Sequence, residues 1–220
     1  MSKPGLDTLL LGTLEYIDTH QAAFLAAIQR HLLLFVIVLL ISVAIGVPLG
    51  MASAKRPIFS AWALNIFSAL KMIPSLALLM VFIPILGVGF LPAMIALIVH
   101  ALPTILINTY TGYSQIDEAI LENATAMGLT EREILWRVET PLALPLIFSG
   151  LRTSSVDIIA TTTVAAYIGA GGLGEFVIVG ITNMNSVIML AGSLTVAAIA
   201  LIVDFIFSLL QRRLIRYQIA

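Results

Sequence analysis

The chain has 220 residues, of which 60% are hydrophobic and only 10% are charged, and its formal net charge is −1. Soluble domains carry about 25% charged residues, so the composition indicates a membrane protein, and the balanced charge excludes a basic surface for nucleic acid. The chain has no cysteine, which excludes disulfides and cysteine-ligated metals. Its three histidines are scattered and lack partners at metal-binding spacing, so no metal site is expected.

The first 30 residues are predicted to form a peripheral segment. Leu6, Leu10, Leu14 and Ile17 recur at helical spacing, which is typical of an amphipathic helix on a membrane surface. A tail without stable structure is the alternative. We therefore divide the chain into a peripheral helix over residues 1–30, a transmembrane domain over 31–210 and a cytoplasmic tail over 211–220.

Four apolar stretches are long enough to cross a membrane, because about 20 helical residues span ~30 Å of hydrocarbon. They are residues 31–53, 90–110, 151–170 and 187–210. A fifth stretch, residues 59–86, contains Lys71 and Pro74. Since proline removes a backbone hydrogen bond, we expect this stretch to cross as a tilted or kinked helix. The predicted fold is an all-α membrane protein with five transmembrane helices.

Positively charged residues orient these spans, because arginine and lysine in short loops stay in the cytoplasm. The loops after the second and fourth spans contain neither residue type. The segments after the first, third and fifth spans contain Lys55, Arg56, Arg132, Arg137, Arg212, Arg213 and Arg216. This pattern predicts an N-terminus outside and a C-terminus in the cytoplasm. A sixth span through residues 6–28 would bury Glu15 and Asp18 in lipid, which is costly.

Residues 169–174 read GAGGLG and match the glycine spacing of a dinucleotide-binding loop. That motif needs a preceding strand and an acid about 20 residues further on, whereas in this chain a membrane helix precedes the glycines. We interpret the match as accidental. Glycines end helices, permit positive φ and let backbones approach closely. The segment is therefore either a flexible or tightly packed element near the outer mouth of a pathway, or a helix cap and turn.

Residues 111–142 form the only long polar stretch, and it carries helix signals at regular intervals. Ser114 with Asp117 marks a helix start, and Gly128 marks a helix stop. Thr130 with Glu133 forms a capping box that starts a second short helix, which Pro141 is expected to end.

A helix, a glycine elbow and a second helix would project below the membrane as a rigid element. Small and apolar residues flank its charged face, namely Ala124, Ala126, Met127 and Leu129. We expect this element to insert into a groove of another protein. A solvated helical hairpin is the alternative.

Ionisable residues inside spans mark a pathway or a pair, since they are costly at membrane depth. Asp157, followed by Thr161, Thr162 and Thr163, is interpreted as lining a water-filled pathway, and pairing with Lys71 is the alternative. Lys71 itself could instead extend to the cytoplasmic surface. We interpret Asp204 as structural and His100 as a core histidine.

The polar loop resembles the EAA loop of ABC-importer permeases, whose pattern is E-A-A, three residues, G, nine residues, then I-x-L-P. Glu122, Ala124, Gly128 and Pro141 keep this spacing, and the chain departs from it at Asn123, Val138 and Thr140. Five further stretches are similar to permeases for osmoprotectants such as glycine betaine, choline or carnitine. They are IPSLALL (73–79), LPTILINTYTGY (102–113), VETPLALP (138–145), SGLRT (149–153) and AAYIGAGGLGE (165–175).

The resemblance implies the transmembrane domain of a type I ABC importer in the bacterial inner membrane, with the coupling loop over residues 114–141. In this family two permease subunits, identical or paralogous, enclose the pathway, ATPase subunits dock on the EAA loops, and an extracytoplasmic binding protein delivers the solute. The expected ATPase-coupling residues are Glu122, Ala124, Met127, Gly128, Leu129, Glu133 and Pro141. The expected pathway and gate residues are Lys71, Ser75, Asp157, Thr161, Thr162, Tyr167, Gly171 and Gly172.

The chain itself is expected to be non-catalytic and to bind no cofactor, with ATP and magnesium held by the other subunits. It contains no phosphate-binding loop of the G-x-x-x-x-G-K-[ST] type. Three alternatives stay open: an ABC permease for another small solute such as an amino acid, an ion-coupled secondary carrier, and an intramembrane enzyme. A carrier predicts internal repeats, and no convincing duplication is found. An enzyme using Asp157 and His100 lacks a recognisable spacing of nucleophile and base.

Overall fold

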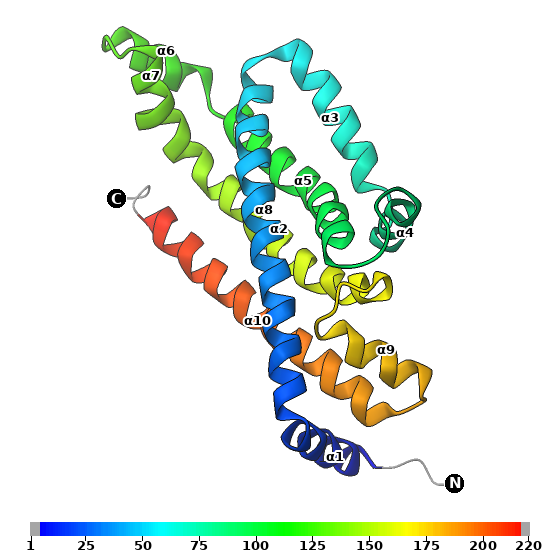
Figure 1. Ribbon diagram of the computed structural model, residues 1–220. Coiled ribbons are helices and arrows are strands. Elements are labelled where there is room, and N and C mark those ends of the chain that lie inside the picture. The colour runs from blue at the N-terminus through cyan, green and yellow to red at the C-terminus, as the bar shows by residue number, and fades with distance from the viewer. Residues whose placement is uncertain (1–4, 217–220) are drawn as a thin grey trace. The chain divides into compact units, whose positions relative to one another are not determined.

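The computed structural model describes residues 5–216 (Figure 1). Within that range all the regular elements are helices, which confirms the predicted all-α class. The first four residues of the expected peripheral segment and the last four of the expected tail lie outside the described residues.

The helices follow one another along the chain with short connections. In order they are α1 (Leu6–Thr19), α2 (Gln21–Lys55), α3 (Pro57–Lys71), α4 (Ser75–Leu86), α5 (Phe90–Ser114), α6 (Glu118–Ala126), α7 (Glu131–Ile134), the π-helical turn η1 (Leu135–Glu139), α8 (Thr140–Ala165), the 3-10 turn η2 (Ala166–Ile168), α9 (Gly174–Thr182) and α10 (Ser186–Arg216).

Four helical segments of the described chain are long and apolar enough to cross a membrane: Gln21–Lys55, Phe90–Ser114, Glu131–Ile168 and Ser186–Arg213. The segments Ser60–Lys71 and Ser75–Leu86 form a bent pair that makes a fifth span when counted as one. Residues 72–74 between them are not helical, so the expected kink is a complete break. Pro74 explains the break, because it lacks an N–H and keeps the preceding residue out of the helical region.

The helices extend beyond the predicted spans in two places. The first span is predicted to begin at residue 31, and the helix that contains it, α2, begins ten residues earlier at Gln21, because residues 21–30 are good helix formers and Phe24 and Ala27 are buried. The loop expected between residues 170 and 187 contains the nine-residue helix α9.

The described chain divides into two compact units, and each of the helices α2, α5, α8 and α10 contributes residues to both. Unit 1 contains the residues up to Leu39, Pro74–Ile98 and Ser155–Val203. Unit 2 contains Leu40–Ile73, Val99–Ser154 and the residues from Asp204 onward.

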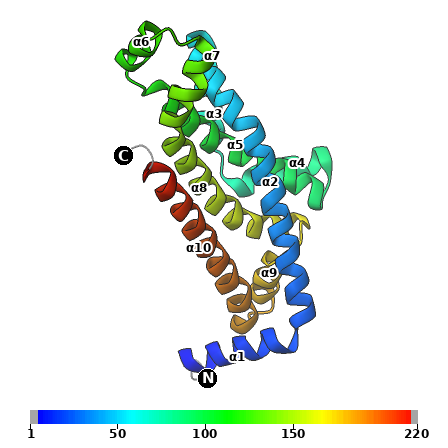
Figure 2. The same cartoon turned by 90° about the vertical axis from the view of Figure 1, so that its left-hand side faces the viewer.

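In unit 1, α9 lies beside the N-terminal part of α10 (Figures 1 and 2). Gly180 faces Met189 without room for a side chain, and a Cβ on Gly192 would lie 2.9 Å from the side chain of Val177. The same part of α10 also contacts α1, since a Cβ on Gly12 would lie 3.4 Å from the side chain of Val187. Unit 1 therefore holds α1, α9 and the start of α10 in close contact.

In unit 2, glycines bring three helices together. A Cβ on Gly50 of α2 would lie 2.7 Å from the carbonyl oxygen of Leu106 on α5. A Cβ on Gly150 of α8 would lie 2.6 Å from the Cβ of Asn108 on α5. Small residues at such crossings allow membrane helices to approach closely. Consequently α2, α5 and α8 form a tightly packed group within this unit.

Candidate functional site

The polar loop of unit 2 folds into a helical hairpin, which we call the coupling hairpin and define as residues 117–140. The side chain of Asp117 caps α6, because its Oδ1 accepts a hydrogen bond of 3.0 Å from the backbone N–H of Ala119. The expected start at Ser114 is wrong, since Ser114 is the last residue of α5. The helices α6 and α7 lie side by side at one end of unit 2 (Figures 1 and 2).

Gly128 forms the elbow between these two helices, which confirms the predicted helix stop. Its φ is +82°, a left-handed conformation that favours glycine. Its N–H donates to the carbonyl of Thr125 at 2.9 Å, and the N–H of Leu129 donates to the carbonyl of Ala124 at 3.3 Å. This pair of bonds is the Schellman motif, which satisfies the last carbonyls of a helix. The chain therefore leaves α6 in a defined direction.

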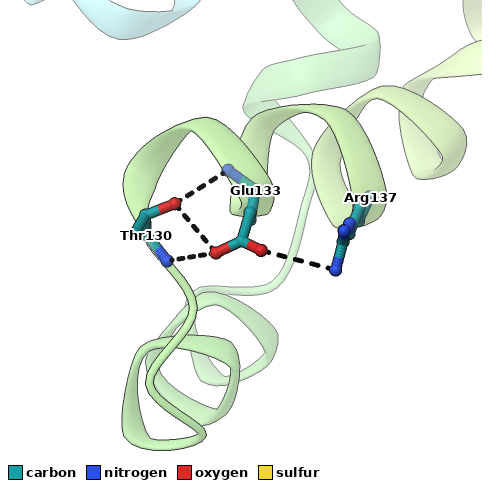
Figure 3. A network of polar contacts seen from close by, with 3 residues as sticks. All are labelled: Thr130, Glu133 and Arg137. Atoms are coloured by element: carbon teal, nitrogen blue, oxygen red, sulfur yellow. Dashed lines mark hydrogen bonds and ion pairs between the residues drawn. The ribbon is translucent and has the colours of Figure 1, made fainter.

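The predicted capping box at the start of α7 is confirmed (Figure 3). The Thr130 hydroxyl accepts from the backbone N–H of Glu133 at 3.4 Å, and Glu133 Oε2 accepts from the backbone N–H of Thr130 at 3.1 Å. The hydroxyl also donates to Glu133 Oε2 at 2.9 Å. Arg137 Nη1 lies 3.4 Å from Glu133 Oε1 and extends the network along the helix. The elbow and the following helix start are thus both built by local hydrogen bonds.

The expectation that Pro141 ends the second helix is wrong. The chain continues from α7 through η1 into α8, so a single helical segment runs over Glu131–Ile168. The π-helical turn at Leu135–Glu139 interrupts the regular hydrogen-bond ladder just before Pro141. Pro141 therefore lies where the regular ladder is already interrupted, so its missing N–H is tolerated better than inside a regular helix. As a result, the hairpin is continuous with a membrane-spanning helix.

The expected coupling residues differ in exposure. Met127 at the elbow is 81% exposed, whereas Ala124 is 5% exposed. Glu122 is exposed, and Leu129, Glu133 and Pro141 are half-buried. The hairpin thus offers Met127, beside acidic side chains, to another molecule, while Ala124 packs inward.

The expected pathway residues lie in both units. Lys71 ends α3 in unit 2, and its side chain is exposed. The others lie in unit 1: Ser75 and Asp157 are half-buried, and Tyr167 is 54% exposed.

Two of the three threonines after Asp157, Thr161 and Thr162, are buried and bonded within their own helix. The hydroxyl of Thr161 donates to the carbonyl of Asp157 at 2.7 Å, and that of Thr162 donates to the carbonyl of Ile158 at 2.7 Å. Thr162 is fully buried and Thr161 is 7% exposed. Within unit 1 both side chains therefore face packed protein, which distinguishes them from the more accessible Asp157.

The glycine segment after α8 ends that helical stretch and packs closely against α2, while its place near the mouth of a pathway stays a prediction. Gly169 has a φ of +78° and ends the helix, with the N–H of Ala170 donating to the carbonyl of Ala165 at 3.3 Å. Gly171 and Gly172 also have positive φ, and they contact Arg30 and His31 on α2 without room for a side chain on Gly171. The segment follows a helix rather than a strand, in agreement with the interpretation of its spacing as accidental.

The segment is held in place by Arg30, whose role is not evident from the sequence. Its Nε donates to the carbonyl of Ala170 at 2.8 Å, and its guanidinium carbon lies 5.9 Å from the centroid of the Phe90 ring. This distance is typical of a cation–π contact. No local spacing relates Arg30 to residue 170, so no sequence pattern could have indicated the contact.

A second feature that sequence reasoning missed is an ion pair between α8 and α10 in unit 2. Arg152 Nε lies 2.6 Å from Asp204 Oδ1, and Arg152 Nη2 lies 2.7 Å from Asp204 Oδ2. Such a bidentate geometry orients both groups. Asp204 thus pairs with Arg152, as a structural role would require. The sequence signal for this pair was an arginine inside one predicted span and an acid inside another.

The chain matches the family of binding-protein-dependent transport system inner membrane components over residues 46–216, and it belongs to that family. It is therefore a multi-pass membrane permease and a non-catalytic subunit of an ABC transporter. An ABC importer of this class works with ATPase subunits and a substrate-binding protein.

Among characterised relatives, the carnitine transport permease OpuCB of Listeria monocytogenes is 38% identical over 84% of this chain and 85% of its own length. The choline permease OpuBB of Bacillus subtilis is 32% identical, covering 91% and 92%. The glycine betaine/carnitine/choline permease OpuCD of Bacillus subtilis is 37% identical, covering 93% and 89%.

A chain of the methionine ABC transporter MetNI, solved in an inward-facing conformation, superposes with a TM-score of 0.76 at 23% identity, covering 89% of this chain and 98% of that one. The likeness confirms the predicted fold, the transmembrane domain of a type I ABC importer.

Proposed function

We propose that this chain is the permease subunit of an ATP-driven importer for osmoprotectants, which are quaternary ammonium compounds such as glycine betaine, carnitine or choline. The observation that carries this proposal is the 32–38% identity, over most of the chain, to permeases named for these solutes. An amino acid is the alternative solute, but the likeness to the methionine transporter is at lower identity and concerns the fold.

The pathway in this proposal is enclosed by two permease subunits, either two copies of this chain or this chain with a paralogue. A binding protein outside the membrane delivers the solute to them. Asp157 is our first candidate for a side chain that lines the pathway, because it is ionisable, lies in a spanning helix and is half-buried. Ser75 and Tyr167 are further candidates, and Lys71, Gly171 and Gly172 are candidates for the gate.

Coupling in this proposal takes place through the hairpin. Met127 presents an apolar side chain that is 81% exposed, and Gly128 sets the angle at which it is presented. The companion ATPase subunits bind ATP and magnesium, and this chain binds no cofactor. When the ATPase subunits close, the hairpin would follow them as a rigid body. Because α7 continues into α8, that movement would reach a membrane span directly.

Reconstitution in proteoliposomes tests this function. The permease would be reconstituted with its companion ATPase and a binding protein, and uptake of labelled glycine betaine, carnitine and choline would be measured separately, with methionine as the comparison solute. We expect uptake of at least one osmoprotectant that requires both ATP and the ATPase subunit. Uptake that follows a pH gradient without ATP would contradict the proposal and support a secondary carrier. ATP-dependent uptake of methionine alone would contradict the solute assignment.

A further inference from the structure

Three helices of unit 2 end close together, and side chains join their ends. Lys55 is the last residue of α2, Tyr113 lies at the end of α5, and Glu139 and Thr140 form the junction between η1 and α8. Lys55 Nζ lies 2.7 Å from Glu139 Oε2, and the Tyr113 hydroxyl lies 2.9 Å from Thr140 Oγ1. Both contacts therefore meet at the base of the coupling hairpin.

Thr140 also completes the π-helical turn on which these contacts lie. Its backbone N–H bonds to the carbonyl of Leu135, five residues earlier, and its hydroxyl donates to the same carbonyl at 2.7 Å. A hydroxyl has a single hydrogen, so the contact with Tyr113 has the tyrosine as donor and Thr140 Oγ1 as acceptor. The I-x-L-P pattern has leucine at this position, and a leucine side chain could form neither bond.

The ion pair at the junction is partly withdrawn from solvent. The side chain of Glu139 is 12% exposed, whereas that of Lys55 is 44% exposed. A carboxylate with little solvent access needs a counter-charge, and removing one member of such a pair leaves the other uncompensated. Replacing Lys55 would therefore leave the half-buried Glu139 without its counter-charge at the hairpin junction.

In a π-helical turn the backbone hydrogen bonds join residues five positions apart instead of four. Such turns are rare inside α-helices and are frequent at functional sites. If the hairpin pivoted at η1, its movement would not reach the spans. We propose that Lys55, Tyr113, Glu139 and Thr140 form a clasp that prevents this pivoting, so that the hairpin moves as one body with the ends of α2, α5 and α8. This inference rests on the proposed coupling function, and it makes these four residues positioning residues for transport.

The first test measures solute transported per ATP hydrolysed in the reconstituted complex, using glycine betaine, carnitine and choline. Lys55→Gln removes the ion pair with Glu139, and Thr140→Val removes the hydrogen bonds of the Thr140 hydroxyl with Tyr113 and Leu135. We expect each to lower the coupling ratio about fivefold or more, within the usual range of coupling between sites, while ATP hydrolysis continues. The exchange Lys55→Glu with Glu139→Lys is expected to restore most of the ratio. Arg137→Gln is the matched control, because its ion pair with Glu133 joins residues four positions apart, in α7 and η1, instead of connecting the hairpin to α2 or α5.

The second test does not depend on the solute. The chain has no cysteine, so Ile45→Cys on α2 and Glu118→Cys on α6 allow this chain to be spin-labelled at these two positions alone before it is assembled with the other subunits. Pulsed electron paramagnetic resonance on the assembled complex would give the distribution of distances between the labels. We expect a narrow distribution in the parent and in Arg137→Gln, and a broader one in Lys55→Gln and Thr140→Val.

The two tests separate the clasp from the proposed function. Broadened distances in a complex that transports none of the three solutes would support the clasp and contradict the solute assignment. Normal transport of an osmoprotectant, with the coupling ratio and the distance distribution unchanged in Lys55→Gln and Thr140→Val, would overturn the clasp and leave the proposed function standing.

Discussion

Replacing Gly128 by valine is the most informative single change in the hairpin. A Cβ at this position would meet no atom within 4 Å, so crowding adds nothing to the effect. The effect comes from the backbone, because φ is +82°, and a left-handed conformation costs an L-residue about 1–2 kcal/mol, with the upper end expected for a β-branched side chain. About 2 kcal/mol corresponds to a roughly 30-fold smaller population of the native elbow.

We expect Gly128→Val to lower ATP-driven uptake strongly while the permease still assembles, since the packed helices of unit 2 do not involve this residue. Gly128→Asn is the matched control, because asparagine tolerates the left-handed region better than valine does. The assay is uptake into proteoliposomes alongside ATP hydrolysis by the same preparation. Uptake by the valine variant at the rate of the parent would refute the reasoning that the elbow angle couples the two subunits.

Three further changes test the structure of unit 2. Gly150→Ala would place a methyl group 2.6 Å from the Cβ of Asn108. We expect this overpacking to reduce the free energy of unfolding by about 1–3 kcal/mol and so to lower the melting temperature of the purified permease. An unchanged melting temperature would contradict the close packing of α5 and α8. Arg152→Gln leaves Asp204 without its counter-charge and is expected to destabilise the permease more than replacing both residues by leucine; equal effects would show that the pair is unimportant. Thr130→Ala removes the capping box at about 1 kcal/mol, and we expect faster amide hydrogen exchange in α7, whereas unchanged exchange would contradict the role of the cap.

The elbow and the helix start were predictable because their bonds are local. Gly128 bonds to a residue three positions away, and Thr130 and Glu133 are also three positions apart, so the spacing of residue types is sufficient to indicate the geometry. The spans were predictable for a different reason: a bilayer requires long apolar helices, and this requirement acts on composition rather than on contacts.

The errors arose where a rule was applied without knowledge of the surrounding hydrogen bonds. Proline normally ends a helix, but the π-helical turn before Pro141 already interrupts the regular hydrogen bonds, so the helix continues through this residue.

Other contacts were missed because they join residues far apart in the sequence. The pair of Arg152 with Asp204 joins residues 52 positions apart, and only the packing of α8 on α10 brings them together. The contact of Arg30 with Ala170 was missed for the same reason, since 140 positions separate the two residues.

The proposed function requires that a companion ATPase holds the hairpin containing Gly128 on the cytoplasmic side. Because the chain has no cysteine and Met127 is 81% exposed, a single Met127→Cys variant reports on this directly. In the assembled complex, a short thiol cross-linker should join position 127 to an ATPase subunit, and a membrane-impermeant thiol reagent should reach it only from the cytoplasmic side once the ATPase is stripped away. Labelling from the outer side of intact cells, or cross-linking to no ATPase subunit while the complex stays assembled, would contradict the account.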